Sequence, residues 1–162
     1  MKIICLVGQC YSGKSHFIEH YLKRMFPCSV IHLGEYFRQK GFDGVRVDSE
    51  VLANTIKHLR CQWQLSTDEH FEDTIILDNA FKDVEQADAV LKELDSQNVS
   101  VMWLCDKRSN VDFKKRGRDD DTNIEQKRKL WEDNSNALNH YLIDKGIDII
   151  RVHNTDEGYL LK

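Results

Sequence analysis

The feature that most constrains the fold of this 162-residue chain is a glycine-rich segment, residues 8–15, GQCYSGKS. It carries glycine, lysine and serine at every fixed position of the pattern Gly-x-x-x-x-Gly-Lys-Ser/Thr. A continuous apolar run at residues 3–7 precedes it, as expected of a parallel strand buried on both faces. Residues 14–25 follow with the apolar spacing of a helix, and Pro27, the only proline, closes that helix. The sequence therefore predicts a strand, a tight turn and a helix in direct succession.

A turn in this position is typical of phosphate binding. Its glycines let the backbone bend so that successive N–H groups point at phosphate oxygens, and the following helix adds its positive N-terminal dipole. Lys14 is placed to reach the β and γ phosphates, and the hydroxyl of Ser15 to ligate Mg²⁺. The alternative, a chance turn with an exposed lysine, is disfavoured by the flanking strand and helix. We expect ATP to be held by Gly8, Gln9, Cys10, Tyr11, Ser12, Gly13, Lys14, Ser15 and His16.

The rest of the chain alternates short apolar runs with segments of helical spacing. The apolar runs at residues 29–33, 74–77, 99–104 and 147–152 predict four more strands. Helical spacing occupies the intervals between them, with a break near residues 41–47 that contains two glycines. Strands that alternate with helices favour a parallel sheet with helices on both faces and right-handed crossovers. We therefore predict one three-layer α/β domain over residues 1–162, with about five parallel strands.

Composition limits the environments in which the chain is expected to work. A net charge of −4 argues against a general nucleic-acid or membrane surface. No apolar run approaches the ~20 residues of a membrane-spanning helix, and the N-terminal run is too short for a secretory signal. The five cysteines are odd in number and lack CxxC spacing, which disfavours a disulfide framework or a zinc site. We expect a cytoplasmic monomer without membrane or nucleic-acid partners.

An acidic residue, Asp78, follows the predicted strand at residues 74–77. In open parallel sheets, nucleotide chemistry gathers at the carboxyl ends of the strands. Taken alone, an aspartate at such a position is more often a helix cap. Beside the glycine-rich turn, a carboxylate that holds Mg²⁺ through water is favoured. Ser15 and Asp78 are therefore the predicted metal-binding residues.

Three further segments resemble the adenylate kinase branch of the nucleoside monophosphate kinases. Residues 34–38, GEYFR, are similar to the family's Gly-Asp-Leu-Leu-Arg after its second strand. Residues 78–87, DNAFKDVEQA, match its Asp-Gly-Phe-Pro-Arg and subsequent Gln-Ala with identical spacing. Residues 116–121, RGRDDD, are similar to its arginine-rich lid, and Lys127-Arg128 to a Lys-Arg pair on a long helix, with Lys129 as an alternative register. The resemblance covers nearly the whole chain.

The resemblance implies a P-loop kinase fold with an acceptor-binding helical insert at residues 34–65 and a short arginine-rich lid at residues 107–121. It implies transfer of the γ-phosphoryl group of ATP to a nucleoside monophosphate or deoxynucleoside monophosphate, with Mg²⁺. In the family, arginines clamp the phosphates, an acidic pair orients the lid arginines, and a glutamine reads the acceptor base. The implied catalytic residues are Lys14, Arg116, Arg118 and Arg128, and the implied acceptor-binding residues are Gly34, Arg38, Lys82 and Gln86.

Two other functions stay open at this point. A P-loop kinase could phosphorylate a hydroxyl group on a small metabolite or a nucleic-acid end, with Glu35 or Asp78 as the general base. A degenerate kinase could bind nucleotide as a regulatory module. Lys82 in place of the family's arginine and Leu33 in place of a threonine motivate this second alternative.

Overall fold

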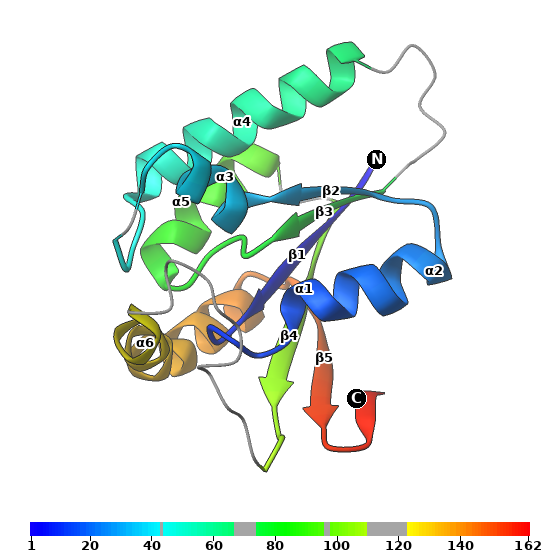
Figure 1. Cartoon of the computed structure of the whole chain (residues 1–162). Coiled ribbons are helices and arrows are strands. Elements are labelled where there is room, and N and C mark those ends of the chain that lie inside the picture. Colours follow the sequence, from blue (N-terminus) through cyan, green and yellow to red (C-terminus); the bar gives the residue numbers. More distant parts are fainter. Residues whose placement is uncertain (43, 67–73, 96–97, 110–122) are drawn as a thin grey trace.

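The computed structural model describes residues 1–42, 44–66, 74–95, 98–109 and 123–162. Six strands form one sheet in the order β2-β3-β1-β4-β5-β6 (Figure 1). The first five are parallel, and β6 pairs antiparallel with β5. Their bounds are Lys2–Gly8 (β1), Ser29–His32 (β2), Thr74–Asp78 (β3), Val99–Asp106 (β4), Asp148–Thr155 (β5) and Gly158–Leu161 (β6).

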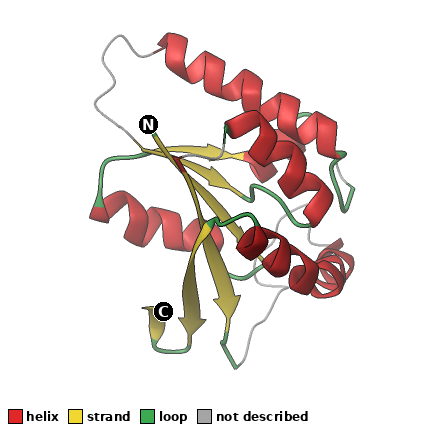
Figure 2. Ribbon diagram, turned by 180° about the vertical axis from the view of Figure 1, so that it is seen from behind, coloured by secondary structure: helices red, strands yellow, loops and turns green. Residues whose placement is uncertain are grey.

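Helices cover both faces of this sheet (Figures 1 and 2). After the glycine-rich turn, residues 14–25 form one continuous helical stretch with a π-helical turn, η1, in its middle. The helices are α1 (Lys14–Phe17), η1 (Ile18–Leu22), α2 (Lys23–Met25), α3 (Leu33–Gln39), α4 (Ser49–Ser66), α5 (Val84–Leu94) and α6 (Ile124–Asp144). The predicted α/β class and the five parallel strands are confirmed.

The central strand β1 explains the two-sided core. Its residues Ile3, Cys5 and Val7 pack with α3, α4, α5 and α6, whereas Ile4 and Leu6 pack with α1 and η1 on the opposite face. All five side chains are buried because side chains alternate between the faces of a strand and both faces are covered. The continuous apolar run in the sequence is the consequence of this two-sided burial.

The order of the strands follows from crossovers of a single hand. The chain leaves β1 through α1 and α2 on one face and reaches the edge strand β2. It then runs back across the sheet through β3, β4 and β5, with every connecting helix on the other face. A reversal of direction combined with a change of face keeps the hand of the crossovers the same. The reversal leaves β1 between β3 and β4, so the turn after β1 lies where a doubly wound sheet binds its ligands.

Two elements differ from the sequence prediction. Leu33 was expected to end a strand, but it is the first residue of α3, which begins directly after β2. The break predicted near residues 41–47 of the helical insert is confirmed, because α3 ends at Gln39 and α4 begins at Ser49, and Gly41 has a positive φ of 84°. β6 has no counterpart among the predicted strands. Among the described residues, no helix is long and apolar enough to cross a membrane.

Candidate functional site

The turn after β1 is held in a conformation that only glycine can adopt at its end. Gly13 is the N-cap of α1 and has a φ of 95°, in the left-handed region. A Cβ atom at this position would lie 2.6 Å from Nδ2 of Asn154 and 3.0 Å from the hydroxyl of Tyr159. Both the backbone conformation and the close approach of β5 and β6 therefore require glycine here. Tyr11 also has a positive φ, 66°, so the turn contains two residues with left-handed backbone conformation, Tyr11 and Gly13.

Lys14 folds back over this turn. Its Nζ atom donates to the carbonyl oxygens of Gly8 and Gln9, at 3.1 and 2.9 Å. The ammonium group is thus already positioned above the loop whose N–H groups are expected to hold phosphate. This is the position from which a lysine of the Gly-x-x-x-x-Gly-Lys pattern reaches a bound phosphate chain.

Ser15 and Asp78, the predicted metal-binding residues, lie together at the ends of neighbouring elements. The Ser15 hydroxyl donates to Oδ2 of Asp78 at 3.3 Å. The Asp78 side chain is only 8% exposed, and its other oxygen, Oδ1, has no hydrogen-bond partner among the described residues. A buried carboxylate oxygen without a partner is costly unless a ligand satisfies it. One hydroxyl and one free carboxylate oxygen are hard donors of the kind that Mg²⁺ prefers, so this pair fits the ion.

His32, the last residue of β2, approaches the same carboxylate. Its Nδ1 atom lies 3.0 Å from Oδ2 of Asp78, and its Nε2 atom lies 3.8 Å from Oε1 of Glu19. The hydrogen bond to Asp78 raises the pKa of His32 above its ordinary value, against the opposing effect of burial. The imidazole orients the carboxylate from the side opposite to its unpartnered oxygen.

This contact gives a prediction for the ionisation of His32. Because its pKa is raised in the folded state, the pair stabilises the fold below the ordinary pKa, and the contribution is lost as pH rises through the folded-state pKa. In Asp78→Asn, the pKa of His32 is expected to fall, while that of His153 on β5 stays unchanged. An NMR titration of the histidine rings measures both. An identical His32 titration in the two proteins would contradict the contact.

A cavity of about 790 Å³ extends from the glycine-rich turn to α3 and the start of α5. Its volume lies within the range of small-molecule sites. The turn, with Lys14 and Ser15, lines one part of the cavity, and Asp78 lines it between the two ends. The predicted acceptor-binding residues Gly34, Arg38 and Lys82 line the other part. The fold therefore brings these predicted residues, which are far apart in the sequence, to one cavity.

Gln86, the fourth predicted acceptor residue, is placed differently. It is 3% exposed and lies outside the lining of this cavity. Its Nε2 atom donates to the carbonyl of Val47 at 2.7 Å, and its Oε1 atom accepts from the backbone N–H of Lys82 at 2.8 Å. Both ends of its amide are thus engaged by backbone groups, and the side chain ties the turn before α4 to the start of α5.

Gln86→Ala is therefore expected to lower the free energy of unfolding by about 2 kcal/mol, because it leaves two partly buried backbone groups without these partners. Urea denaturation measures this change. The matched control is Gln39→Ala, since Gln39 is exposed and its amide donates only at 3.4 Å to Glu35. A Gln86→Ala protein as stable as wild type, but altered in its choice of acceptor base, would show that the side chain reads the base instead.

The predicted lid is only partly described. Arg116, Arg118 and the acidic pair at residues 120–121 lie outside the described residues. Arg128, on α6, donates from Nη1 to the carbonyl oxygen of Cys10 at 2.7 Å. In return, the side-chain amide of Gln9 donates to the backbone carbonyl of Arg128 at 3.4 Å. Lys127 is the residue of the pair that lines the cavity. Of the two alternatives left open by the sequence, Arg128 contacts the loop, whereas Lys129 is exposed.

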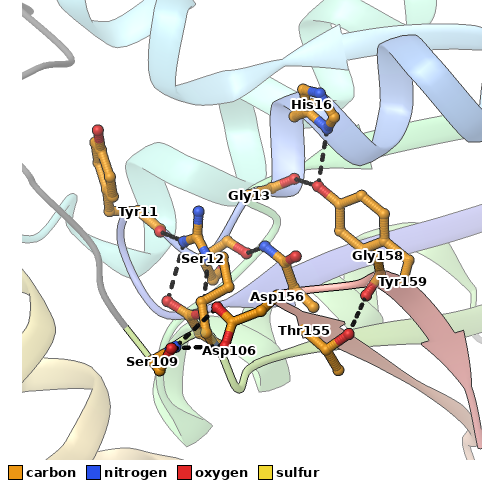
Figure 3. Close-up of polar contacts among 12 residues, drawn as sticks. Tyr11, Ser12, Gly13, His16, Asp106, Ser109, Thr155, Asp156, Gly158 and Tyr159 are labelled. Atoms are coloured by element: carbon orange, nitrogen blue, oxygen red, sulfur yellow. Dashed lines mark hydrogen bonds and ion pairs between the residues drawn. The ribbon is translucent and has the colours of Figure 1, made fainter.

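Several residues at the site were not predicted. Arg108 donates to the carbonyl of Tyr11 at 2.6 Å and forms an ion pair with Asp106 at 2.9 Å. Asn154 donates to the turn from β5, and Tyr159 donates to it from β6 (Figure 3 shows Tyr159). Arg108 belongs to the basic run that begins at residue 107, which was a usable signal. Asn154 and Tyr159 belong to no motif.

Comparison of the chain with protein-family models and with curated proteins finds no family and no relative that matches it.

Proposed function

We propose that this chain is a P-loop kinase that transfers the γ-phosphoryl group of ATP to a nucleoside monophosphate or deoxynucleoside monophosphate. The observation that carries the proposal is the single cavity that joins the glycine-rich turn to the basic side chains of Arg38 and Lys82. A kinase needs two anionic groups side by side, and this cavity offers a cationic environment at both ends. The three-layer α/β sheet with the turn at its centre supports a P-loop fold.

In the proposed reaction, the turn binds the phosphate chain of ATP through its N–H groups, and Lys14 neutralises the β and γ phosphates. Arg38 and Lys82 hold the acceptor phosphate, whose oxygen attacks the γ-phosphorus atom. A new P–O bond forms to the acceptor while the bond to the bridging oxygen of ADP breaks. No strong general base is required because the acceptor phosphate is already anionic. Ser15 and Asp78 would hold Mg²⁺, which would neutralise part of the phosphate charge.

The residues support positioning rather than covalent chemistry. The Asp78 carboxylate is engaged by Ser15 and His32 through one oxygen, which fits an ion-binding role better than that of a base for a hydroxyl acceptor. Glu35 lines the cavity and is exposed, so it is the group that would serve a hydroxyl acceptor. The nature of the acceptor therefore distinguishes the two kinase functions.

A coupled assay of ADP formation tests the proposal. Wild-type protein is supplied with ATP, Mg²⁺ and, one at a time, the common nucleoside and deoxynucleoside monophosphates. We expect ADP formation that depends on one or a few of them. ADP formation only with hydroxyl acceptors, such as nucleosides or nucleic-acid ends, would favour the alternative kinase function. ATP binding without ADP formation from any acceptor would favour the regulatory module.

Arg38→Ala is expected to raise the KM for the acceptor by about tenfold or more, because it removes a charged hydrogen bond to the acceptor phosphate. The KM for ATP is expected to stay unchanged, since Arg38 lies on α3 and not on the glycine-rich turn. Steady-state kinetics with each substrate varied in turn measure both. The control is Lys40→Ala, whose ammonium lies over the ring of Tyr36. A rise in the KM for ATP alone would reverse the assignment of the two ends.

A further inference from the structure

The carbonyl groups of the glycine-rich turn are held in an unusual way. Every carbonyl oxygen from residue 8 to residue 13 accepts a hydrogen bond from a side chain. Only Lys14 belongs to the turn and its helix, while the other donors come from three separate parts of the chain. The donors are Lys14 for Gly8 and Gln9, Arg128 for Cys10, Arg108 for Tyr11, Asn154 for Ser12 and Tyr159 for Gly13.

These contacts determine where the N–H groups of the turn point. A peptide unit is planar and trans, so its carbonyl and its N–H point in opposite directions. A side chain that holds the carbonyl of one residue therefore also orients the N–H of the next. Holding six successive carbonyls orients the N–H groups of residues 9–14 before any anion arrives. Preorganised donors of this kind bind charge without a reorganisation cost.

Two of the donors, Asn154 and Tyr159, form a directly opposed pair on the β5–β6 hairpin. Asn154 is 6% exposed, and its Nδ2 atom donates to the carbonyl of Ser12 at 2.9 Å. The Tyr159 hydroxyl donates to the carbonyl of Gly13 at 3.1 Å and lies 3.0 Å from Nδ1 of His16 (Figure 3). The same pair leaves no room for a Cβ atom at Gly13. The hairpin therefore contacts the turn closely at the residues that begin α1.

The hydrogen bonds of Tyr159 also define the protonation of His16. A carbonyl can only accept, so the single hydroxyl hydrogen of Tyr159 goes to Gly13. Nδ1 of His16 must then donate to the Tyr159 oxygen. The proton on Nδ1 follows from this geometry, in which the Tyr159 oxygen lies 3.0 Å from Nδ1 of His16. Burial raises the pKa of Tyr159, which keeps its hydroxyl protonated.

We infer that Asn154 and Tyr159 are positioning residues that orient the N–H groups of the turn and thereby set its affinity for the triphosphate chain. The inference rests on the proposed function only in that the turn binds phosphates. It means that the β5–β6 hairpin, which carries no recognised motif, controls how tightly the glycine-rich turn binds phosphates. The acceptor end at Arg38 and Lys82 is not touched by these contacts.

Tyr159→Phe tests this inference with little risk to the fold. The ring stays packed against Phe17 and Tyr21, with centroids 4.9 and 4.8 Å away, and only the hydroxyl is lost. Affinity for ATP and for inorganic triphosphate is measured by calorimetry, and a fall of about fivefold to tenfold is expected, the effect of one hydrogen bond. Asn154→Ala is expected to act in the same direction. The KM for the acceptor is expected to stay unchanged in both variants.

The matched control is Tyr141→Phe on α6, which loses a hydroxyl that donates to Asp88 at 2.8 Å, away from the turn. It is expected to bind triphosphate like wild type. A spectroscopic readout accompanies the affinities. Ring-nitrogen NMR is expected to show the His16 proton on Nδ1 in wild type and its loss from that atom in Tyr159→Phe.

The outcomes separate this inference from the proposed function. Wild-type protein that binds triphosphate, with weaker binding in Tyr159→Phe and Asn154→Ala only, supports the inference whatever the acceptor is. Equal triphosphate affinity in wild type and both variants overturns it and leaves the proposed function standing. Wild-type protein that does not bind triphosphate overturns both. A proportional rise of the ATP and acceptor KM values in Tyr159→Phe would show a general structural role and also overturn it.

Discussion

Replacement of Lys14 by alanine is expected to lower kcat by about 10³-fold or more, while the fold remains intact. Preorganised cations on a transferring phosphoryl group supply rate factors of this size. In the structure, the Lys14 ammonium donates to the carbonyl oxygens of Gly8 and Gln9, at 3.1 and 2.9 Å, and Lys14 lines the cavity. Its charge therefore serves the cavity and not the hydrophobic core. The coupled assay with saturating ATP and acceptor measures the loss.

The control for Lys14→Ala is Lys92→Ala. Lys92 forms an exposed i,i+4 pair with Asp88 at 2.7 Å on α5, a contact that contributes little to stability. Circular dichroism and thermal unfolding should show both variants folded. A Lys14→Ala protein that retains turnover near that of wild type would contradict the assignment of the turn as the ATP site.

Asp78→Asn is expected to lower kcat by about 10²-fold or more, without lowering the stability of the nucleotide-free protein. The amide keeps an oxygen to accept from Ser15 and His32 but removes the charge that we assign to Mg²⁺ binding. The native carboxylate is 8% exposed and has one oxygen without a partner among the described residues, so its desolvation is compensated only through the other oxygen, by Ser15 and His32. At a pH above the pKa of His32, where the imidazole is neutral, removing the charge of Asp78 is therefore expected to leave the melting temperature unchanged or higher.

Two measurements distinguish an ion-binding role from a structural one. Mn²⁺, a spectroscopic substitute for Mg²⁺, is titrated into each protein with ATP, and electron paramagnetic resonance counts the bound ion. Asp78→Asn is expected to bind Mn²⁺ more weakly. Asp83→Asn is the control, since Asp83 caps α5 and pairs with Arg46 at 2.6 Å, and its loss should affect stability but not Mn²⁺ affinity. Equal losses of stability and activity in Asp78→Asn would contradict the account.

The sequence predicts those parts of the fold in which buried positions give a recognisable pattern of apolar residues. β1, β3 and β4 are buried on both faces, so they read as apolar runs, which in β4 only Ser100 interrupts before Cys105. β6 was missed because it is a four-residue edge strand whose Leu160 and Leu161 are more than half exposed, so no alternation or long apolar run marks it. The start of α3 at Leu33 was missed because β2 passes into the helix without a turn residue.

The candidate site divides in a similar way. Ser15 and Asp78 were predicted to act together because parallel strands end at one edge of the sheet, and the structure brings them within 3.3 Å. Asn79, which stands where the related segment has glycine, has a φ of 65°, a conformation that asparagine tolerates. Gln86 was predicted to bind the acceptor because its spacing from Asp78 matches the family. Spacing does not determine where a side chain points, and the amide of Gln86 donates to the backbone carbonyl of Val47.

The residues that hold the turn from outside could not be predicted. Arg108, Asn154 and Tyr159 donate to backbone carbonyls, which every residue type carries. Such contacts require no particular side chain at the residue whose carbonyl accepts the hydrogen bond, so they give no sequence pattern there. They depend on the tertiary placement of β4 and of the β5–β6 hairpin, which only the fold determines.

The central claim is that the γ-phosphoryl group of ATP passes from the glycine-rich turn to the phosphate of a nucleoside monophosphate. It is tested most directly by following ATP labelled with radioactive phosphorus at the γ position, with wild-type protein, Mg²⁺ and the acceptor that the coupled assay selects. The account predicts that the label appears as the β-phosphate of a nucleoside diphosphate, and that it returns to ATP when the labelled diphosphate and ADP are supplied. Label found in an ester of a hydroxyl group or in inorganic phosphate, or retained in ATP with every acceptor, would contradict it.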